Sequence, residues 1–456
     1  MRTVNPLTEW AVHRGLTLNQ RLAATAANGV DWLFKRDTLI QSGRTWFELV
    51  HDSDLMSVRY YALPEDEHIE LVDGSRMPIR RDQYAVPLVL VPPLGVTTET
   101  FDLMPQRSLV RYMAATGFKV YLVDWGKPRR EHAHLGLRDY ALTMMGAALE
   151  KIRGHSRCED LSLMGWCMGG LLCLLYQGLT LDARVRNLVT VASPIDLESG
   201  SGVVAGLAGV AQALNGPAQL VNRYSNLRLT TLDPARLSLP PWMTTLVFKL
   251  TDPVGSVTTY WDLVARLWDR EFVESHSTTS DYLNNMLMYP GGVLKDMAVS
   301  AVAGNQFATG RVQLGDSVAQ LDAITCSLLA FAGETDHLVP PAVAARGVHV
   351  VASKDKAFRV APGGHMGVII GSVAQSAVWA ESAAWLAQRS APRAADKRKT
   401  KGKAKAKTKA KTKAKTKAKT KAKARVEATA KTATGRRVKQ PPAEGRQMDL
   451  YQSLEG

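Results

Sequence analysis

Residues 163–172 read LMGWCMGGLL, and this stretch decides how the rest of the chain is interpreted. It places Cys167 between two glycines, in the pattern Gly165-x-Cys167-x-Gly169, directly after the apolar run 160–165. A Gly-x-nucleophile-x-Gly turn between a strand and a helix forms a nucleophile elbow, in which small residues make room for a sharp, strained turn. We therefore expect a strand, then the Cys167 thiol at the edge of a sheet, then a helix.

The elbow also predicts how this thiol reacts. A helix N-terminus favours an anion, and a thiolate is nucleophilic enough to form a thioester with an acyl group. The backbone N–H of Met168 would then point into the site as an oxyanion donor. The elbow residues that flank the thiol are Gly165, Gly169 and Gly170. The alternative interpretation is that Cys167 is a structural thiol buried in the core.

From residue 86 onward, short runs rich in β-branched residues alternate with stretches of helical pattern. Near-continuous apolar strands separated by helices indicate a mostly parallel sheet with helices on both faces. The alternation stops between about 198 and 321, which is too long for a loop and predicts an inserted, mostly helical cap. The predicted strands are VPLVLV (86–91), KVYLVDW (119–125), DLSLMG (160–165), NLVTVA (187–192), SLLAFAG (327–333) and AFRVAP (357–362).

Two further residues stand directly after predicted strands. Asp336 lies in FAGETDHLVPP and His365 in PGGHMG, so both are expected at the carboxyl ends of strands, where such sites are built. The chain order nucleophile, acid, histidine is that of an α/β-hydrolase fold. We expect Cys167 as nucleophile, His365 as general base and then acid, and Asp336 as the group that orients the imidazole. Alternatively, Asp336 caps a helix or His337 is the base.

The second oxyanion donor is expected in the loop PPLGV (92–96), which follows the strand 86–91. The N–H of Leu94, Gly95 or Val96 could serve, and the sequence does not choose among them. The four cysteines form no C-x-x-C pair, so no metal site is expected. We expect no cofactor either.

The pattern divides the chain into five parts. They are an N-terminal helical region (1–56), the first part of the core (57–197), the cap (198–321), the second part of the core (322–390) and a basic tail (391–456). The helical prediction for 1–56 rests on apolar residues at roughly helical spacing. Asp73-Gly74 is a turn signal and indicates a hairpin region. No apolar stretch is long enough to span a bilayer.

The positive charge of the chain lies at its C-terminal end. Of 57 basic and 42 acidic residues, 22 and 5 fall in 391–456, so the preceding part is close to neutral. Lysine alternates with alanine or threonine through much of 397–425, a composition that predicts disorder. No aromatic residue lies between Trp385 and Tyr451, so binding by base stacking is not expected. Non-specific binding of DNA or another polyanion is predicted; the alternative is a solubilising tail without a partner.

Taken together, the motifs resemble those of polyhydroxyalkanoate (PHA) synthases, polyester polymerases of the α/β-hydrolase superfamily. The resemblance implies a covalent acyl-Cys167 intermediate, with Asp336 and His365 in the roles given above. It also implies an acyltransferase that polymerises (R)-3-hydroxyacyl-CoA and releases CoA. The basic tail resembles those of histone H1-like bacterial proteins. The motifs are GWCMGG (165–170), VDWGKP (123–128), VPPLG (91–95), GETDHLVPP (333–341) and GGHMGVIIG (363–371).

The resemblance further implies partners and a location. The partners are the acyl-CoA, the growing polyester chain, a second copy in a homodimer and, as in the short synthases, a second synthase subunit. The implied location is cytoplasmic, at a polyester granule surface or the nucleoid. The chain departs from the family at GVTTETFD (95–102) and KPRREHAH (127–134). The alternative function is a Cys-dependent hydrolase or thioesterase, or an intracellular polyester depolymerase, on the same scaffold.

Overall fold

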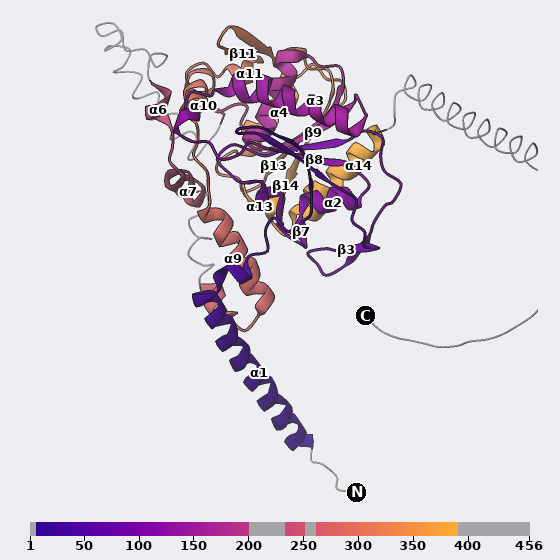
Figure 1. Cartoon of the computed structure of the whole chain (residues 1–456), viewed down its shortest axis with the longest axis vertical. Helices are drawn as coiled ribbons and strands as arrows, with labels where there is room; N and C mark the ends of the chain where they lie inside the picture. Colours follow the sequence, from indigo (N-terminus) through magenta and orange to yellow (C-terminus); the bar gives the residue numbers. More distant parts are fainter. Residues whose placement is uncertain (1–5, 200–232, 251–260, 391–456) are drawn as a thin grey trace, which may run out of the picture. The chain divides into compact units, whose positions relative to one another are not determined.

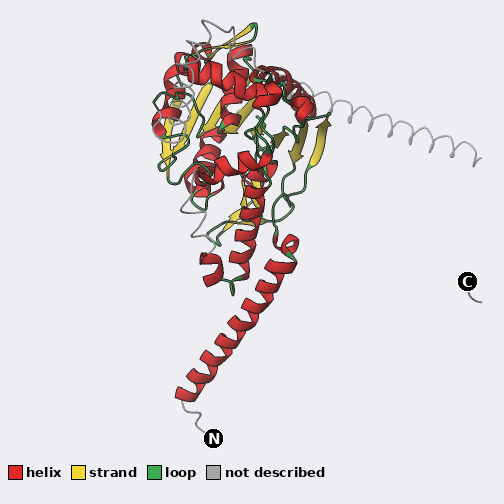
Figure 2. Cartoon of the chain, turned by 90° about the vertical axis from the view of Figure 1, so that its left-hand side faces the viewer, coloured by secondary structure: helices red, strands yellow, loops and turns green. Residues whose placement is uncertain are grey.

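The computed structural model describes residues 6–199, 233–250 and 261–390, and its core is an eight-stranded sheet (Figures 1 and 2). The order across the sheet is β1-β2-β8-β5-β9-β10-β13-β14; the pairs β1–β2 and β2–β8 are antiparallel, and the pairs from β8 to β14 are parallel. All six predicted strands are confirmed. The strands of this sheet are β1 (Glu48–Asp52), β2 (Ser57–Tyr61), β5 (Leu88–Val91), β8 (Val120–Asp124), β9 (Leu161–Trp166), β10 (Val185–Val191), β13 (Ser327–Gly333) and β14 (Lys356–Ala361).

Helices cover both faces of this sheet, as the apolar strands predicted. Alternate side chains of β5 enter different cores: Val89 and Val91 pack with α3, α4 and α12, whereas Leu88 and Leu90 pack with α2, α13 and α14. Figure 1 shows α3 and α4 on one side of the sheet and α2 and α13 on the other. These helices are α2 (Leu109–Ala115), α3 (Met145–Ser156), α4 (Met168–Thr180), α12 (Pro341–Val350), α13 (Gly367–Ile370) and α14 (Ala380–Arg389).

The N-terminal part differs from its prediction. Helix α1 (Pro6–Phe34) and the 3-10 turn η1 (Arg36–Leu39) are helical as expected, but 48–52 form strand β1. The helical prediction over 1–56 is therefore wrong at its C-terminal end. The physical reason is tertiary: β1 is an edge strand, and its backbone hydrogen bonds come from β2 rather than from its own chain neighbours.

The predicted hairpin region holds a small hairpin and one strand of the main sheet. Strands β3 (His68–Glu70) and β4 (Arg76–Pro78) pair antiparallel around Asp73-Gly74, with Gly74 at a φ of 77°. The other short elements outside the cap are η2 (Thr98–Phe101), β6 (Asp102–Met104), β7 (Arg107–Ser108), η3 (Arg130–His132) and the π-helical turns η4 (Asp139–Met144) and η8 (Gln375–Trp379).

The inserted segment is helical in most of its described part, yet it also contains a hairpin. Strands β11 and β12 pair antiparallel, and the backbone N of Gln320 would lie 3.1 Å from a Cβ placed on Gly178 of α4. The end of the predicted cap therefore packs on the core. The elements are α6 (Pro234–Leu237), α7 (Pro241–Leu250), a helical stretch at 261–265, α9 (Arg270–Asn284), α10 (Gly291–Met297), η6 (Ala298–Ala303), α11 (Gln306–Thr309), β11 (Arg311–Leu314), β12 (Ser317–Gln320) and η7 (Leu321–Ala323).

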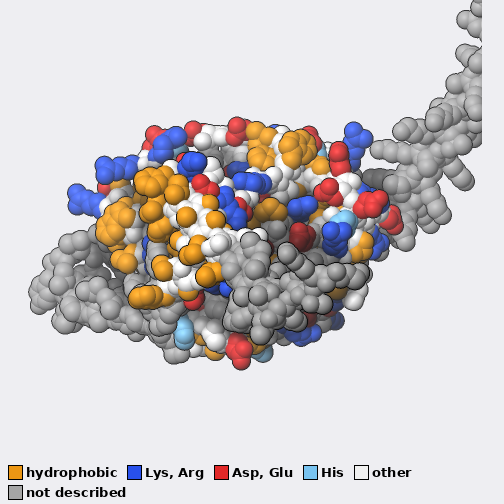
Figure 3. Space-filling view, turned by 90° about the horizontal axis from the view of Figure 1, so that it is seen from below, with side chains coloured by type: hydrophobic (Ala, Val, Ile, Leu, Met, Phe, Trp, Pro, Cys, Tyr) orange, Lys and Arg blue, Asp and Glu red, His pale blue; other side chains and the backbone are white. Residues whose placement is uncertain are grey.

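Several large apolar side chains are exposed outside the sheet domain. Leu33 and Phe34 of α1 are 64% and 79% exposed, and Trp242 and Trp261 of the inserted segment are 66% and 74% exposed. Figure 3 shows patches of hydrophobic side chains on one face of the molecule. No helix of the described residues is long and apolar enough to cross a membrane.

The described residues belong to one unit, which ends at Ala391. The predicted disordered tail, 391–456, lies outside the described residues. The boundaries proposed for the cap and the two parts of the core stay predictions.

Candidate active site

Cys167 stands at a sharp turn between β9 and α4. Its backbone has φ 52° and ψ −122°, a conformation that L-residues rarely adopt and that is typical of strained functional positions. The N–H of Cys167 donates to the carbonyl of Val191 at the end of β10 (2.7 Å), which fixes the turn to the neighbouring strand. The side chain is partly exposed, whereas the nearby Cys173 of α4 is fully buried.

The glycines around Cys167 are required by close backbone approaches. A Cβ on Gly165 would lie 2.4 Å from the backbone of Gly169 and Gly170, so the helix could not start where it does. A Cβ on Gly169 would lie 2.1 Å from the carbonyl oxygen of Val91. The end of β5 therefore lies directly against the first turn of α4, beside the thiol.

His365 and Asp336 meet at the adjacent strand ends. Nδ1 of His365 lies 2.8 Å from Oδ2 of Asp336, and both side chains are almost completely buried. The other carboxylate oxygen, Oδ1, accepts the backbone N–H groups of Leu338 (2.9 Å) and Val339 (2.8 Å). Asp336 therefore caps a turn and orients His365 at the same time, whereas His337 is exposed.

The loops that carry these two residues are tied together. The N–H of Glu334 donates to Ala361 at the end of β14 (2.8 Å), and that of Thr335 donates to Gly363 (3.2 Å). A Cβ on Gly333 would lie 2.5 Å from the carbonyl oxygen of Gly363. Register between β13 and β14 therefore sets the spacing of the acid and the imidazole.

Trp166 supports the imidazole, and the sequence analysis missed this role. Its Nε1 donates to the carbonyl of His365 (3.2 Å), and its ring centroid lies 5.3 Å from that of the imidazole. Trp166 is completely buried. The sequence could have indicated this role, because Trp166 directly precedes Cys167 in the motif. Trp166 ends β9, and its side chain lies on the opposite face of the sheet from that of Leu163.

The electrostatics of the site favour an imidazolium. Burial alone lowers the pKa of His365, but the negative charges of Cys167 and Asp336 outweigh it and raise the pKa to about 10. Nδ1 of His365 is bonded to Asp336, so Nε2 is the nitrogen that meets the Cys167 thiol, and the hydrogen bond between them also raises this pKa. This nitrogen is therefore available to exchange a proton with Cys167 or with a bound molecule.

The residues predicted for the oxyanion hole lie around the same point. Met168 is the first residue of α4, and its N–H has no acceptor among the described residues. Leu94 and Val96 are buried, while Gly95 has a φ of 81° and its carbonyl accepts the N–H of Leu287 (2.8 Å). Several candidate N–H groups thus remain at this loop.

Two tyrosines of the inserted segment reach the site and were not predicted. The hydroxyl of Tyr282 lies 2.5 Å from Oγ1 of Thr100. The ring of Tyr289 packs on Gly95, because its Cδ2 would lie 2.8 Å from a Cβ placed there. Burial raises the pKa of both phenols, and the negative charge of Cys167 adds to it; at Tyr282 the hydrogen bond with Thr100 opposes this shift and the charge of Glu99 also adds to it. The sequence shows that the inserted segment is rich in aromatic residues, but it does not indicate which of them reach the site.

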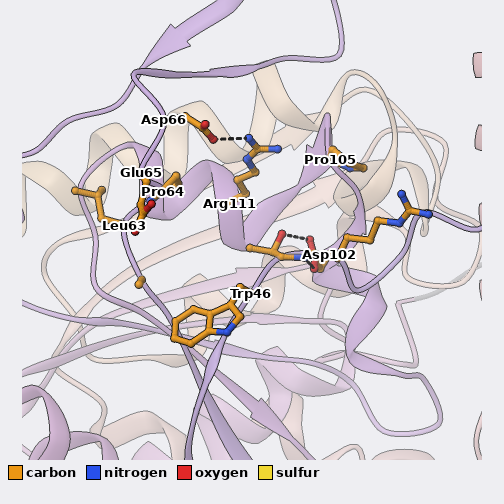
Figure 4. Close-up of a pocket in the computed structure, with 11 residues that line it drawn as sticks. Trp46, Leu63, Pro64, Glu65, Asp66, Asp102, Pro105 and Arg111 are labelled. Carbon is orange, nitrogen blue, oxygen red and sulfur yellow. Dashed lines mark hydrogen bonds and ion pairs between the residues drawn. The ribbon is translucent and has the colours of Figure 1, made fainter. Parts of the chain in front are cut away.

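Two cavities lie near the sheet. One of about 560 Å³ adjoins the loop after β5 and is lined by Thr97, Tyr282 and Leu287 among others. The other, of about 630 Å³, is drawn in Figure 4; none of the candidate catalytic residues lines it. There Arg111 pairs with Asp66 (3.3 Å). Cys167, Asp336 and His365 do not line the first cavity either; it adjoins the candidate site through the loop after β5 and Tyr282.

The comparisons with known proteins agree with the fold. The model of the alpha/beta hydrolase fold family matches residues 87–372. The chain is 28% identical to the poly(3-hydroxyalkanoate) polymerase subunit PhaC of Haloferax mediterranei over 68% of its own length and 60% of that protein. It is 29% identical to the subunit of the same name from Allochromatium vinosum, over 67% of this chain and 81% of that protein. The chain thus spans less than two thirds of the first relative.

Similarity to solved structures is weaker. A monoacylglycerol lipase from Paleococcus ferrophilus is 18% identical, with a TM-score of 0.39 over 68% of this chain and 99% of that one.

Proposed function

The chain belongs to the alpha/beta hydrolase fold family, and on that premise we propose that it is a poly(3-hydroxyalkanoate) polymerase. It would transfer (R)-3-hydroxyacyl groups from coenzyme A thioesters to a growing polyester. The observation that carries the proposal is the His365–Asp336 pair, 2.8 Å apart, next to the strained Cys167. The similarity to two polymerase subunits supports the choice of substrate.

In the proposed first step, Cys167 is acylated. The thiol proton passes to Nε2 of His365, and the thiolate adds to the thioester carbonyl, whose π electrons move to oxygen. When this oxyanion collapses, the bond from carbon to the CoA sulfur breaks. The CoA sulfur takes the proton from His365 and leaves as free CoA. A pKa of about 10 for His365 favours the imidazolium that this departure needs.

In the second step, the acyl group moves to a hydroxyl group. Nε2 of His365 accepts the proton of the incoming 3-hydroxyl, whose oxygen attacks the acyl-Cys167 carbonyl. The carbon–sulfur bond breaks, and Cys167 regains a proton from His365. The net change is one ester formed and one CoA released for each monomer. No metal or cofactor enters the proposal.

Water is the competing acceptor, and it would make the same site a hydrolase. The burial of His365 and Asp336 supports the transferase, because a dry site disfavours hydrolysis of the acyl-enzyme. Both relatives are named as subunits, and we include a homodimer and a second subunit in the proposal.

The test uses the full chain and (R)-3-hydroxybutyryl-CoA. We expect release of CoA together with an oligomeric or polymeric ester from the wild type, and neither from Cys167→Ala. CoA release accompanied only by free 3-hydroxybutyrate would contradict the polymerase and favour the hydrolase. Mass spectrometry of the quenched protein should find the acyl group on Cys167.

We propose a cytoplasmic location at the surface of the polyester that the enzyme makes. The exposed apolar side chains of α1 and the inserted segment, such as Phe34 and Trp261, support contact with such a surface. Co-sedimentation with polyester particles tests this, and Phe34→Ser combined with Trp261→Ser should reduce it. Equal sedimentation of this variant and the wild type would contradict the contact.

We also propose that the basic tail binds DNA and places the enzyme at the nucleoid. The 22 basic against 5 acidic residues of 391–456 support this, since such binding scales with the number of neutralised phosphates. Deleting 396–440 should abolish retention on duplex DNA at low salt, and retention by the full chain should fall steeply as salt rises. Retention that survives the deletion would contradict the tether.

A further inference from the structure

Tyr289 is fixed over the loop that follows β5. Its backbone N–H donates to the carbonyl of Leu239 (2.9 Å) and its carbonyl accepts the N–H of the same residue (3.1 Å). Two residues earlier, Leu287 donates to the carbonyl of Gly95 (2.8 Å). The Tyr289 ring also packs on Gly95. Residues 287–289 are therefore held against the loop 92–96 by both backbone and side-chain contacts.

The hydroxyl of Tyr289 makes no hydrogen bond to the described residues. Tyr140, which packs edge-on against Trp125 with ring centroids 5.5 Å apart, has a buried hydroxyl without a partner among the described residues. Burial, the charge of Cys167 and then Tyr140 raise the pKa of Tyr289, so its phenol remains a neutral O–H donor. Tyr289 is half-buried and its hydroxyl has no acceptor among the described residues, so this O–H group is available to donate to a bound molecule.

The position of Tyr289 matches a need of the chemistry. Addition of the Cys167 thiolate to a carbonyl creates an oxyanion, which sites of this kind stabilise with two donors. The N–H of Met168 is one of them. The other is expected at the loop 92–96, and the Tyr289 ring lies on Gly95 in that loop. The carbonyl of Gly95 is already bonded to Leu287, so this contact is stable.

We propose that the Tyr289 hydroxyl donates a hydrogen bond to the oxyanion formed on the acyl carbonyl, opposite the N–H of Met168. This inference rests on the proposed function and deepens it, because it assigns a residue of the inserted segment to the reaction centre. The phenol keeps its proton throughout: the donor strengthens its hydrogen bond as negative charge develops on oxygen and weakens it when the intermediate collapses.

Tyr289→Phe is the direct test, since it keeps the ring on Gly95 and removes only the hydroxyl. We expect kcat for CoA release from (R)-3-hydroxybutyryl-CoA to fall roughly 10²-fold, the usual effect of losing one oxyanion donor. KM should change by less than about threefold, because the donor acts mainly in the transition state. The matched control is Tyr112→Phe, a buried tyrosine that packs on Trp379 and should leave both constants unchanged.

A second readout separates catalysis from damage to the site. Iodoacetamide alkylates Cys167 by displacing iodide and forms no oxyanion, so its rate with Tyr289→Phe should equal that of the wild type. Equal kcat in variant and wild type would overturn the proposal, and so would a parallel loss in alkylation. If the wild type does not use hydroxyacyl-CoA, the same comparison is made on the p-nitrophenolate burst from p-nitrophenyl acetate. That reaction also passes through an oxyanion. A wrong substrate assignment can therefore be distinguished from a wrong role for Tyr289.

Discussion

The two sides of the candidate site are held by different kinds of structure. On the core side, Cys167, Asp336 and His365 follow β9, β13 and β14, and strand pairing and backbone hydrogen bonds fix their spacing. On the cap side, Tyr282 and Tyr289 come from the inserted segment. They meet the core through a few contacts, chiefly those with Thr100 and Gly95.

This difference teaches where each property of the enzyme resides. Groups that exchange bonds need fixed mutual geometry, and the sheet supplies it. Groups on the inserted segment adjoin the reacting carbonyl but exchange no bonds with it, so losing one of them should cost less. Substitutions on the core side should therefore cost far more activity than substitutions on the cap side, and the predictions below test this ranking.

The largest loss is expected from Cys167→Ala. Without the nucleophile no acyl-enzyme forms, so CoA release should drop by roughly 10⁴-fold or more. Stopped assays of CoA release measure this. Cys158→Ala, at one of the two other partly exposed thiols, is the control and should keep full activity. Substantial activity in Cys167→Ala would show that Cys167 is not the nucleophile and that the core side does not carry the bond-exchanging groups.

Asp336→Asn should be next, with a loss of roughly 10²- to 10⁴-fold. It removes a carboxylate that raises the pKa of His365, so the imidazolium should be lost at a lower pH than in the wild type. The alkaline limb of the activity profile should therefore move to lower pH. Glu334→Gln, at an exposed carboxylate in the same loop, should leave the limb in place. An unmoved limb in Asp336→Asn would contradict the pairing.

The same pair makes stability depend on pH. The pKa of His365 is raised from 6.5 to about 10 in the folded protein, so its stabilising contribution is complete below pH 6.5 and is lost as pH rises through about 10. The difference in unfolding free energy between wild type and Asp336→Asn should narrow across that interval. Denaturant titrations at pH 6, 8 and 10 measure it; a constant difference would refute the linkage.

Gly95→Ala should have a moderate effect on the cap side. Its methyl group would lie 2.8 Å from the Tyr289 ring at a positive φ, which pushes the segment away. Overpacking costs typically 1–3 kcal/mol, so we expect roughly tenfold slower CoA release. Gly154→Ala, where a Cβ meets nothing within 4 Å, is the control. A loss as large as that of Cys167→Ala would erase the distinction between the two sides.

Tyr282→Phe should have the smallest effect. It removes one hydrogen bond to Thr100, worth about 1 kcal/mol, while the Thr100 hydroxyl keeps its bond to the Thr97 carbonyl (3.0 Å). Activity should change by less than about threefold at saturating substrate. A double-mutant cycle with Thr100→Val measures the coupling energy between Tyr282 and Thr100. A coupling energy near zero would show that this contact does not fix the inserted segment to the core.

Much of the core side could be predicted because its signals are local. Apolar runs predicted β9, β13 and β14, and the glycines around Cys167 predicted the turn. Asp336 and His365 were found because each follows a strand within a few residues. The strand β1 was missed for the opposite reason: an edge strand of five residues has too short a pattern to distinguish it from a helix.

The sequence by itself determined six strands of the sheet, the elbow and the chain order of Cys167, Asp336 and His365, since each depends on neighbouring residues. Only the tertiary structure decided that Trp166 lies against His365, 199 residues away, and that Tyr289 covers Gly95. Local periodicity carries no information about such pairs. Pairing of β9, β10, β13 and β14 in one sheet brings the first pair together, and the second forms when the inserted segment packs on the loop after β5.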